Sequence, residues 1–136
     1  TEFQTINHAE LLDVQKEGWE IGGHTATHPY LPRVNDDAKL AHELVDSKNI
    51  LEKTLGTKVD YFAYPHGGYD AKIIDKVTEA EYTIAFSTDE SKIDIRTHRY
   101  IVPRVGINRT HGLSELKAAI TPFSLFLKSL VRKLHG

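Results

Sequence analysis

The sequence contains no cysteine, which excludes disulfide bonds, thiolate metal sites and cysteine nucleophiles. Methionine is also absent, and no apolar run approaches the roughly 20 residues that a transmembrane helix needs. A formal net charge of -2 gives no reason to expect binding to nucleic acid or to an anionic membrane surface. The lack of cysteine is compatible with an extracytoplasmic bacterial protein, which is the location we expect.

The length and composition describe an ordinary globular chain. Its 136 residues suit one hydrophobic core, and 40% of them are hydrophobic and 26% charged. No linker-like stretch divides the chain, so residues 1–136 are interpreted as a single domain. The sequence starts at Thr1 without a signal-peptide pattern, and we expect it to be part of a longer protein.

Strand and helix patterns alternate along the chain. Strand patterns cover residues 19–22, 59–64, 82–86 and 99–107. Helices should begin after the N-cap candidates Asn7, Asn35 and Asp70, and two more are expected over 113–120 and 122–134. The alternation predicts an α/β fold with a parallel sheet, and about four strands are too few to close an eight-stranded barrel.

Two further features need an interpretation. Trp19, beside Ile21, is expected in the core, although a sugar-stacking platform is the alternative. The amphipathic segment 122–134 is expected to pack on the sheet, with a membrane or partner surface as the alternative.

The segment 23–29 (Gly-His-Thr-Ala-Thr-His-Pro) follows the first predicted strand. Imidazole nitrogen is a good ligand for zinc and related ions, so His24 and His28 are candidate metal ligands. Pro29 disfavours helical geometry at His28, which predicts a loop. Two exposed loop histidines remain the alternative, because a catalytic zinc needs a third protein ligand.

Two segments in this order resemble motifs of one family. Residues 19–29 are similar to the second motif of the NodB-homology polysaccharide deacetylases (carbohydrate esterase family 4), a His-Ser/Thr-x-x-His after a glycine-rich strand end. Residues 62–67 (Phe-Ala-Tyr-Pro-His-Gly) resemble its third motif, although alone they indicate only a turn at a strand end. The resemblance covers about residues 15–107.

The resemblance implies a partial (β/α) barrel and a metal-dependent hydrolase that removes N-acetyl groups from an N-acetylglucosamine-containing polysaccharide. It makes His24 and His28 ligands of a divalent metal, for which we expect zinc. It also makes the backbone N–H of His66 a donor to the oxyanion. The other residues of that turn, which would bind substrate, are Tyr64, Pro65 and Gly67.

The sequence departs from the family pattern in its first motif. There the family has Thr-Phe-Asp-Asp-Gly, which supplies the general base and an Asp ligand. Asp13 is the single aspartate before His24, and it lies on a predicted helix. The pair Asp36-Asp37 follows the histidines and is assigned to a helix start. We therefore expect the base, the third ligand and the acid upstream of Thr1, and no activity from residues 1–136 alone.

A second departure concerns the arginine that orients the base, because Asp60 and Ala63 stand at the family's arginine positions. Arg104 lies in a Pro-Arg-Val sequence similar to the poly-N-acetylglucosamine deacetylase branch, and we hypothesise that it replaces that arginine. A surface salt bridge is an equally open interpretation. Among the other histidines, His98 and His111 are weaker candidates for the acid. The remaining ones are assigned to solvated helix faces: His8, His42 and His135.

Two other functions remain open: a non-catalytic carbohydrate-binding or structural remnant of the fold, and a simple metal-binding module. The expected partner is an N-acetylglucosamine polymer, and membrane association is expected only through segments outside this sequence. An uncovered sheet edge predicts that the isolated chain self-associates.

Overall fold

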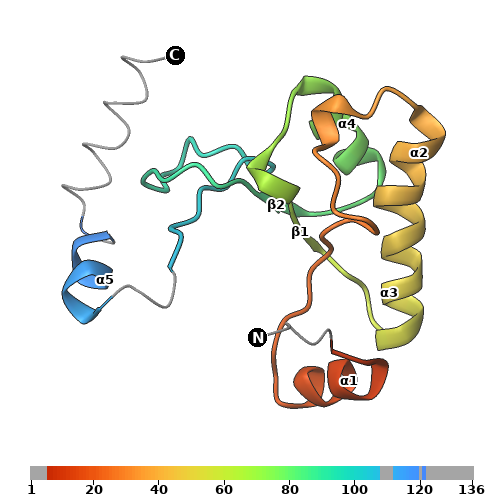
Figure 1. Ribbon diagram of the computed structural model, residues 1–136, viewed down its shortest axis with the longest axis horizontal. Coiled ribbons are helices and arrows are strands. Elements are labelled where there is room, and N and C mark those ends of the chain that lie inside the picture. Colours follow the sequence, from red (N-terminus) through yellow and green to blue (C-terminus); the bar gives the residue numbers. More distant parts are fainter. Residues whose placement is uncertain (1–5, 108–111, 120, 122–136) are drawn as a thin grey trace.

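The computed structural model describes residues 6–107, 112–119 and 121. Its helices and strands follow one another along the chain (Figure 1). They are α1 (His8–Lys16), η1 (Leu31–Arg33), α2 (Asp37–Ala41), η2 (His42–Asp46), α3 (Ser47–Leu55), β1 (Tyr61–Ala63), η3 (Pro65–Gly67), α4 (Ala71–Glu79), β2 (Ile84–Phe86) and α5 (Leu113–Ala119). The helix expected over 122–134 lies outside the described residues, as do His111 and His135.

Four parallel segments lie side by side in chain order. Strands β1 and β2 pair in parallel, with Phe62 opposite Ala85. Gly23 forms a parallel bridge with Phe62, and Val102 forms one with Phe86. The prediction of parallel segments is confirmed, and helices lie between the first three of them, but no helix lies in the described stretch between β2 and Val102. The first and fourth expected strands are reduced to one bridge each.

Helices cover one face of these strands. Helix α2, the π-helical turn η2 and helix α3 form one continuous rod that lies with α4 on the same side of β1 and β2 (Figure 1). Their apolar side chains form the core with those of the strands. The buried hydrophobic residues are Leu31, Leu40, Leu44, Leu55, Val59, Phe62, Tyr64, Ile73, Val77, Ala80, Tyr82 and Ala85.

Helix ends follow the capping rules read from the sequence, with one correction. Asn7 forms the capping box with Glu10, and Asp70 caps α4. The prediction that Asn35 caps the next helix is wrong. Asp36 is the N-cap, because its carboxylate accepts hydrogen bonds from the N–H groups of the second and third helical residues.

The N-terminal helix α1 packs on α3 and leaves Trp19 in solvent. Trp19 is 69% exposed, so the expectation that it belongs to the core is wrong. It precedes the only bridged residue of its segment, Gly23, and the neighbouring Ile21 packs on the core instead. In the described part of the chain, no helix combines the length and the apolar character needed to cross a membrane.

Candidate functional site

The candidate site lies where the parallel segments end. His24 directly follows the bridged Gly23, and the turn η3 follows β1 after Tyr64. Position 23 accepts only glycine without movement, because a Cβ there would lie 2.9 Å from Cζ of Tyr82 and closer still to its hydroxyl. The carboxyl ends of parallel strands share one edge of a sheet, so both motifs reach the same region.

Three imidazole rings meet at this edge. The ring centroids of His24 and His28 are 4.8 Å apart, and those of His28 and His66 are 4.5 Å apart. Both contacts are edge-on, and all three side chains are exposed. The structure thus brings together the two predicted metal ligands, and it adds the His66 ring beside them.

The orientation of His24 is fixed by a backbone acceptor. Its Nδ1 lies 2.6 Å from the carbonyl oxygen of Ala63, the last residue of β1. A carbonyl only accepts, so Nδ1 carries the proton and donates. In the neutral imidazole this leaves Nε2 as the nitrogen with a free lone pair, the one that can bind a metal, and a carbonyl acceptor for the other ring nitrogen is usual for metal-binding histidines.

The backbone of both loops is strained. Four non-glycine residues in the described ranges have positive φ, and three of them are Thr25 (68°), His28 (59°) and His66 (56°). The fourth, Glu81, lies elsewhere. Left-handed conformations of such residues cost on the order of 1 kcal/mol and collect at functional sites. The predicted loop conformation of the histidine segment is therefore confirmed, and the strain itself points to function.

The turn after β1 exposes His66 and buries its neighbours. The Tyr64 hydroxyl donates to the carbonyl oxygen of Tyr100 at 3.0 Å, and burial raises the pKa of Tyr64. Pro65 is also buried, whereas Gly67, with φ 68°, would place a Cβ 2.8 Å from Cβ of Thr88. Tyr64 has no exposed surface, and its backbone N–H and carbonyl oxygen are bonded to Phe86 and Gly67, so its predicted contact with substrate stays a prediction.

The other predicted site residues, Arg104 and His98, each form a hydrogen bond with a backbone group. Arg104 is exposed, and its Nε donates to the carbonyl oxygen of Ser87 at 2.8 Å. Arg104 forms no ion pair with any residue that the structure describes. His98 is exposed on the loop after β2, where its Nδ1 accepts the N–H of Tyr100 at 3.3 Å.

The aspartates near the N-terminal half have structural partners. Asp13 pairs with Lys16 at 3.1 Å, Asp36 caps α2, and Asp37 pairs with Lys72 at 2.9 Å. Within residues 6–107, 112–119 and 121, no group of three or more histidines and acidic residues is arranged to hold a metal ion. The donor set therefore fits two ligands of a divalent ion, His24 and His28.

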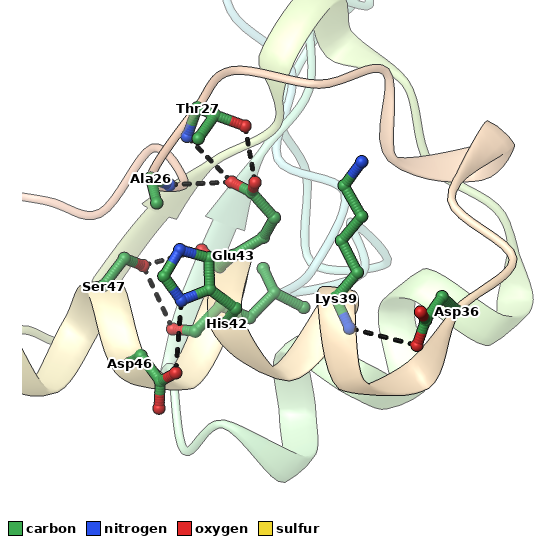
Figure 2. A network of polar contacts seen from close by, with 9 residues as sticks. Ala26, Thr27, Asp36, Lys39, His42, Glu43, Asp46 and Ser47 are labelled. Carbon is green, nitrogen blue, oxygen red and sulfur yellow. Dashed lines mark hydrogen bonds and ion pairs between the residues drawn. The ribbon is translucent and has the colours of Figure 1, made fainter.

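One carboxylate at this site was missed from the sequence. Glu43 is buried, and its carboxylate accepts hydrogen bonds from the backbone of Ala26 and Thr27, inside the histidine loop (Figure 2). A signal existed, because Glu43 lies three residues after Leu40 and beside Leu44 on the apolar face of its helix. A charged residue on that face requires buried partners.

Comparison of the sequence with known protein families identifies the family of this chain. The family model for polysaccharide deacetylases matches residues 3–85, more than half of the sequence. The chain belongs to the polysaccharide deacetylase family.

Solved structures of deacetylases have a similar fold, and one curated protein is similar in sequence over part of the chain. The Streptococcus pyogenes deacetylase PplD, solved with acetate, has a TM-score of 0.78 at 22% identity, with 86% of this chain and 51% of that chain covered, which shows the fold. The putative polysaccharide deacetylase BA0330 of Bacillus anthracis has a TM-score of 0.78 at 26% identity, over 86% of this chain and 37% of its own. The uncharacterized protein YlxY of Bacillus subtilis is 29% identical over 85 residues, 61% of this chain and 26% of that protein. The chain thus matches a partial deacetylase barrel and spans about a quarter to a half of these proteins.

Proposed function

We propose that this chain carries the histidine half of the metal site of a polysaccharide de-N-acetylase. The observation that supports it is the meeting of His24 and His28 at the end of the parallel segments, with His24 Nδ1 held by the Ala63 carbonyl. Zinc is the metal we propose, because imidazole nitrogen suits it and the site is open to solvent. Family membership supports a hydrolase that depends on a metal.

The residues of this chain have distinct roles in that proposal. A bound divalent ion supplies Lewis acidity toward water and the acetamide oxygen. His24 and His28 would hold the ion, and the backbone N–H of His66 would donate to the negative charge that develops on the acetamide oxygen when its carbon is attacked. Arg104 orients the general base, which we place outside residues 1–136 together with the third ligand and the acid.

The substrate we propose is an N-acetylglucosamine polymer. The Pro103-Arg104 sequence favours the poly-N-acetylglucosamine type, and such a polymer places the protein outside the cytoplasm, in the wall or a biofilm. The open edge of the sheet, where the three imidazoles are exposed, suits a substrate that is a chain rather than a small enclosed ligand.

The test is acetate release from N-acetylglucosamine oligomers with added zinc, run on residues 1–136 and on the same chain supplied with the upstream segment. We expect release only with the upstream segment, together with tighter zinc binding. Robust release by residues 1–136 alone would contradict the placement of the base upstream. It would redirect attention to Asp36, Asp37 and His98.

A non-catalytic carbohydrate-binding remnant is the second candidate. It is favoured by the lack of a three-ligand metal group among the residues the structure describes. It predicts that oligomers bind by calorimetry with or without zinc, and that no acetate appears even when the upstream segment is present. Zinc-dependent release under those conditions eliminates it.

A further inference from the structure

Glu43 is the most deeply buried charged side chain near the site, with 1% of its surface exposed. Its carboxylate accepts three hydrogen bonds: from the N–H of Ala26 at 2.9 Å, from the N–H of Thr27 at 2.9 Å, and from the Thr27 hydroxyl at 2.5 Å. All three donors are uncharged and belong to the loop between His24 and His28. A buried carboxylate requires such donors, and these two residues supply all three.

The helix that carries Glu43 departs from regular α-helical geometry at this residue. Glu43 lies in the π-helical turn η2, between α2 and α3, and the Ser47 hydroxyl donates to its carbonyl oxygen at 2.6 Å. Figure 2 shows the Glu43 side chain leaving the helix toward Ala26 and Thr27, while His42 and Asp46 form a separate pair on the helix. A π-turn in an α-helix redirects side chains and is frequent at functional sites.

The loop between His24 and His28 has little internal hydrogen bonding of its own. Thr25 and His28 both have left-handed backbone conformations. Among the described contacts, one hydrogen bond joins two residues of the loop, from the His28 N–H to the Thr25 hydroxyl at 3.0 Å. Ala26 and Thr27 lie between these two strained positions, and their backbone N–H groups donate to the Glu43 carboxylate. Without the carboxylate, their two N–H groups lose their acceptor, and the backbone that joins His24 to His28 loses its main hydrogen bonds to the rest of the protein.

We propose that Glu43 is a positioning residue of the histidine loop, which holds the backbone of Ala26 and Thr27 so that His24 and His28 face one ion. The holding of the loop stands on the hydrogen bonds alone. Its consequence for metal binding rests on the proposed function. Glu43 would act on the metal only through the loop, since its oxygens are occupied by loop donors.

The experiment compares Glu43→Gln with a matched control on the same helical rod. Glu52 also accepts a backbone N–H, that of Val59 at 2.9 Å, but it holds a loop remote from the histidines, so Glu52→Gln is the control. A second pair separates the donors: Thr27→Val removes the hydroxyl, and Thr27→Ser keeps it. Three quantities are measured in the protein: hydrogen exchange of the Ala26 and Thr27 amides without metal, the ring-nitrogen NMR signals of His24, and the dissociation constant for zinc.

We expect Glu43→Gln to speed exchange of both amides at least tenfold and to mix the tautomers of His24. The zinc dissociation constant should rise about 10- to 100-fold, as for other residues that orient metal ligands. Thr27→Val should give a smaller rise that Thr27→Ser does not show. Glu52→Gln should leave all three quantities near those of the parent chain.

Unchanged exchange of Ala26 and Thr27 in Glu43→Gln would overturn the proposal, and so would equal effects of Glu43→Gln and Glu52→Gln. If the parent chain binds no zinc, the metal-binding part of the proposed function fails. The exchange and tautomer measurements, made without metal, then still decide whether Glu43 positions the loop. If zinc binds the parent chain but Glu43→Gln changes neither exchange nor the His24 signals, the positioning role of Glu43 is refuted and the proposed metal site is not.

Discussion

His24 Nδ1 lies 2.6 Å from the carbonyl oxygen of Ala63, which ties the histidine loop to the end of β1. The acceptor belongs to the segment that continues into the turn with His66. This hydrogen bond selects the tautomer of neutral His24, and together with the Gly23–Phe62 bridge it places one motif against the other. Substitution of each histidine tests whether these rings bind a metal.

Replacing His24 or His28 with alanine should remove zinc binding while the protein stays folded, because both side chains are exposed. In the protein supplied with its upstream segment, acetate release should fall to background. His42→Ala is the matched control, since His42 is an exposed histidine whose Nδ1 lies 3.3 Å from an Asp46 carboxylate oxygen on the helix. Near-normal release by His24→Ala with limiting zinc would refute its assignment as a ligand.

Gly23→Ala should destabilise the protein by about 1–3 kcal/mol, as overpacking does. Its Cβ would lie 2.9 Å from Cζ of the buried Tyr82, so the strand end or the ring must shift. Urea unfolding measures the loss, and the shift of His24 should also weaken zinc binding. Gly106→Ala is the control, because among the described residues the nearest atom to its added Cβ is a Glu90 carboxylate oxygen at 3.8 Å. Equal stability of the two variants would show that the contact with Tyr82 relaxes freely.

Lys48→Met should cost about 1–3 kcal/mol of unfolding free energy. The buried Lys48 ammonium donates to the carbonyl oxygens of Ala80 at 3.0 Å and Glu81 at 2.8 Å, and it lies 4.6 Å from the centre of the Tyr82 ring. Methionine fills the same space but leaves both carbonyls without this donor. Lys53→Met, at an exposed position of the same helix, should change stability little. A loss of the same size at both positions would contradict this capping role.

The stability that Glu43 provides should disappear in acid. Burial raises the pKa of Glu43, but the hydrogen bonds from Thr27 and Ala26 outweigh it, and the net pKa lies below its ordinary value of 4.5. A lowered pKa stabilises the fold above the unfolded-state value, and this stabilisation is lost as pH falls through the lower folded-state value. Glu43→Gln should therefore be less stable than the parent chain at pH 7, and the difference should shrink below about pH 4.5. A constant difference from pH 7 to pH 3 would contradict this.

Residues 1–136 should self-associate as concentration rises. The face of β1 and β2 that carries Tyr61 and Phe86 lines an apolar hollow of about 610 Å³ that continues past Gly22 to His24. Exposed strand edges and apolar hollows of this kind promote association. Sedimentation velocity across a hundredfold range of concentration measures it, with Tyr61→Lys as the variant expected to reduce it. A monomer over the whole range would count against the uncovered edge.

Local chemistry made much of this structure predictable. Asn7 and Asp70 cap helices because their side chains reach nearby N–H groups, and Gly56 ends α3 because it adopts a left-handed conformation. The histidine loop was predictable from Pro29 and its glycines. The wrong cap at Asn35 differs from the observed one by a single residue, because two adjacent side chains suit the same role.

Other features depended on residues distant in sequence. Trp19 was expected in the core, but only pairing at Gly23 decides which side chains of that segment are covered. The sequence places Glu43 on the apolar face of its helix, but it does not identify its partners, which lie 16 and 17 residues earlier. No local pattern shows such a pair.

The sequence by itself determined the order of elements, most helix ends and the identity of the two motifs that carry His24, His28 and His66, because these follow from neighbouring residues. Only the tertiary structure decided that the three rings meet, that His24 Nδ1 faces the Ala63 carbonyl, and that the buried Glu43 accepts hydrogen bonds from the loop between His24 and His28. The physical reason is that hydrogen-bond direction and burial are properties of pairs of groups, and these pairs form only when segments far apart in the chain pack together.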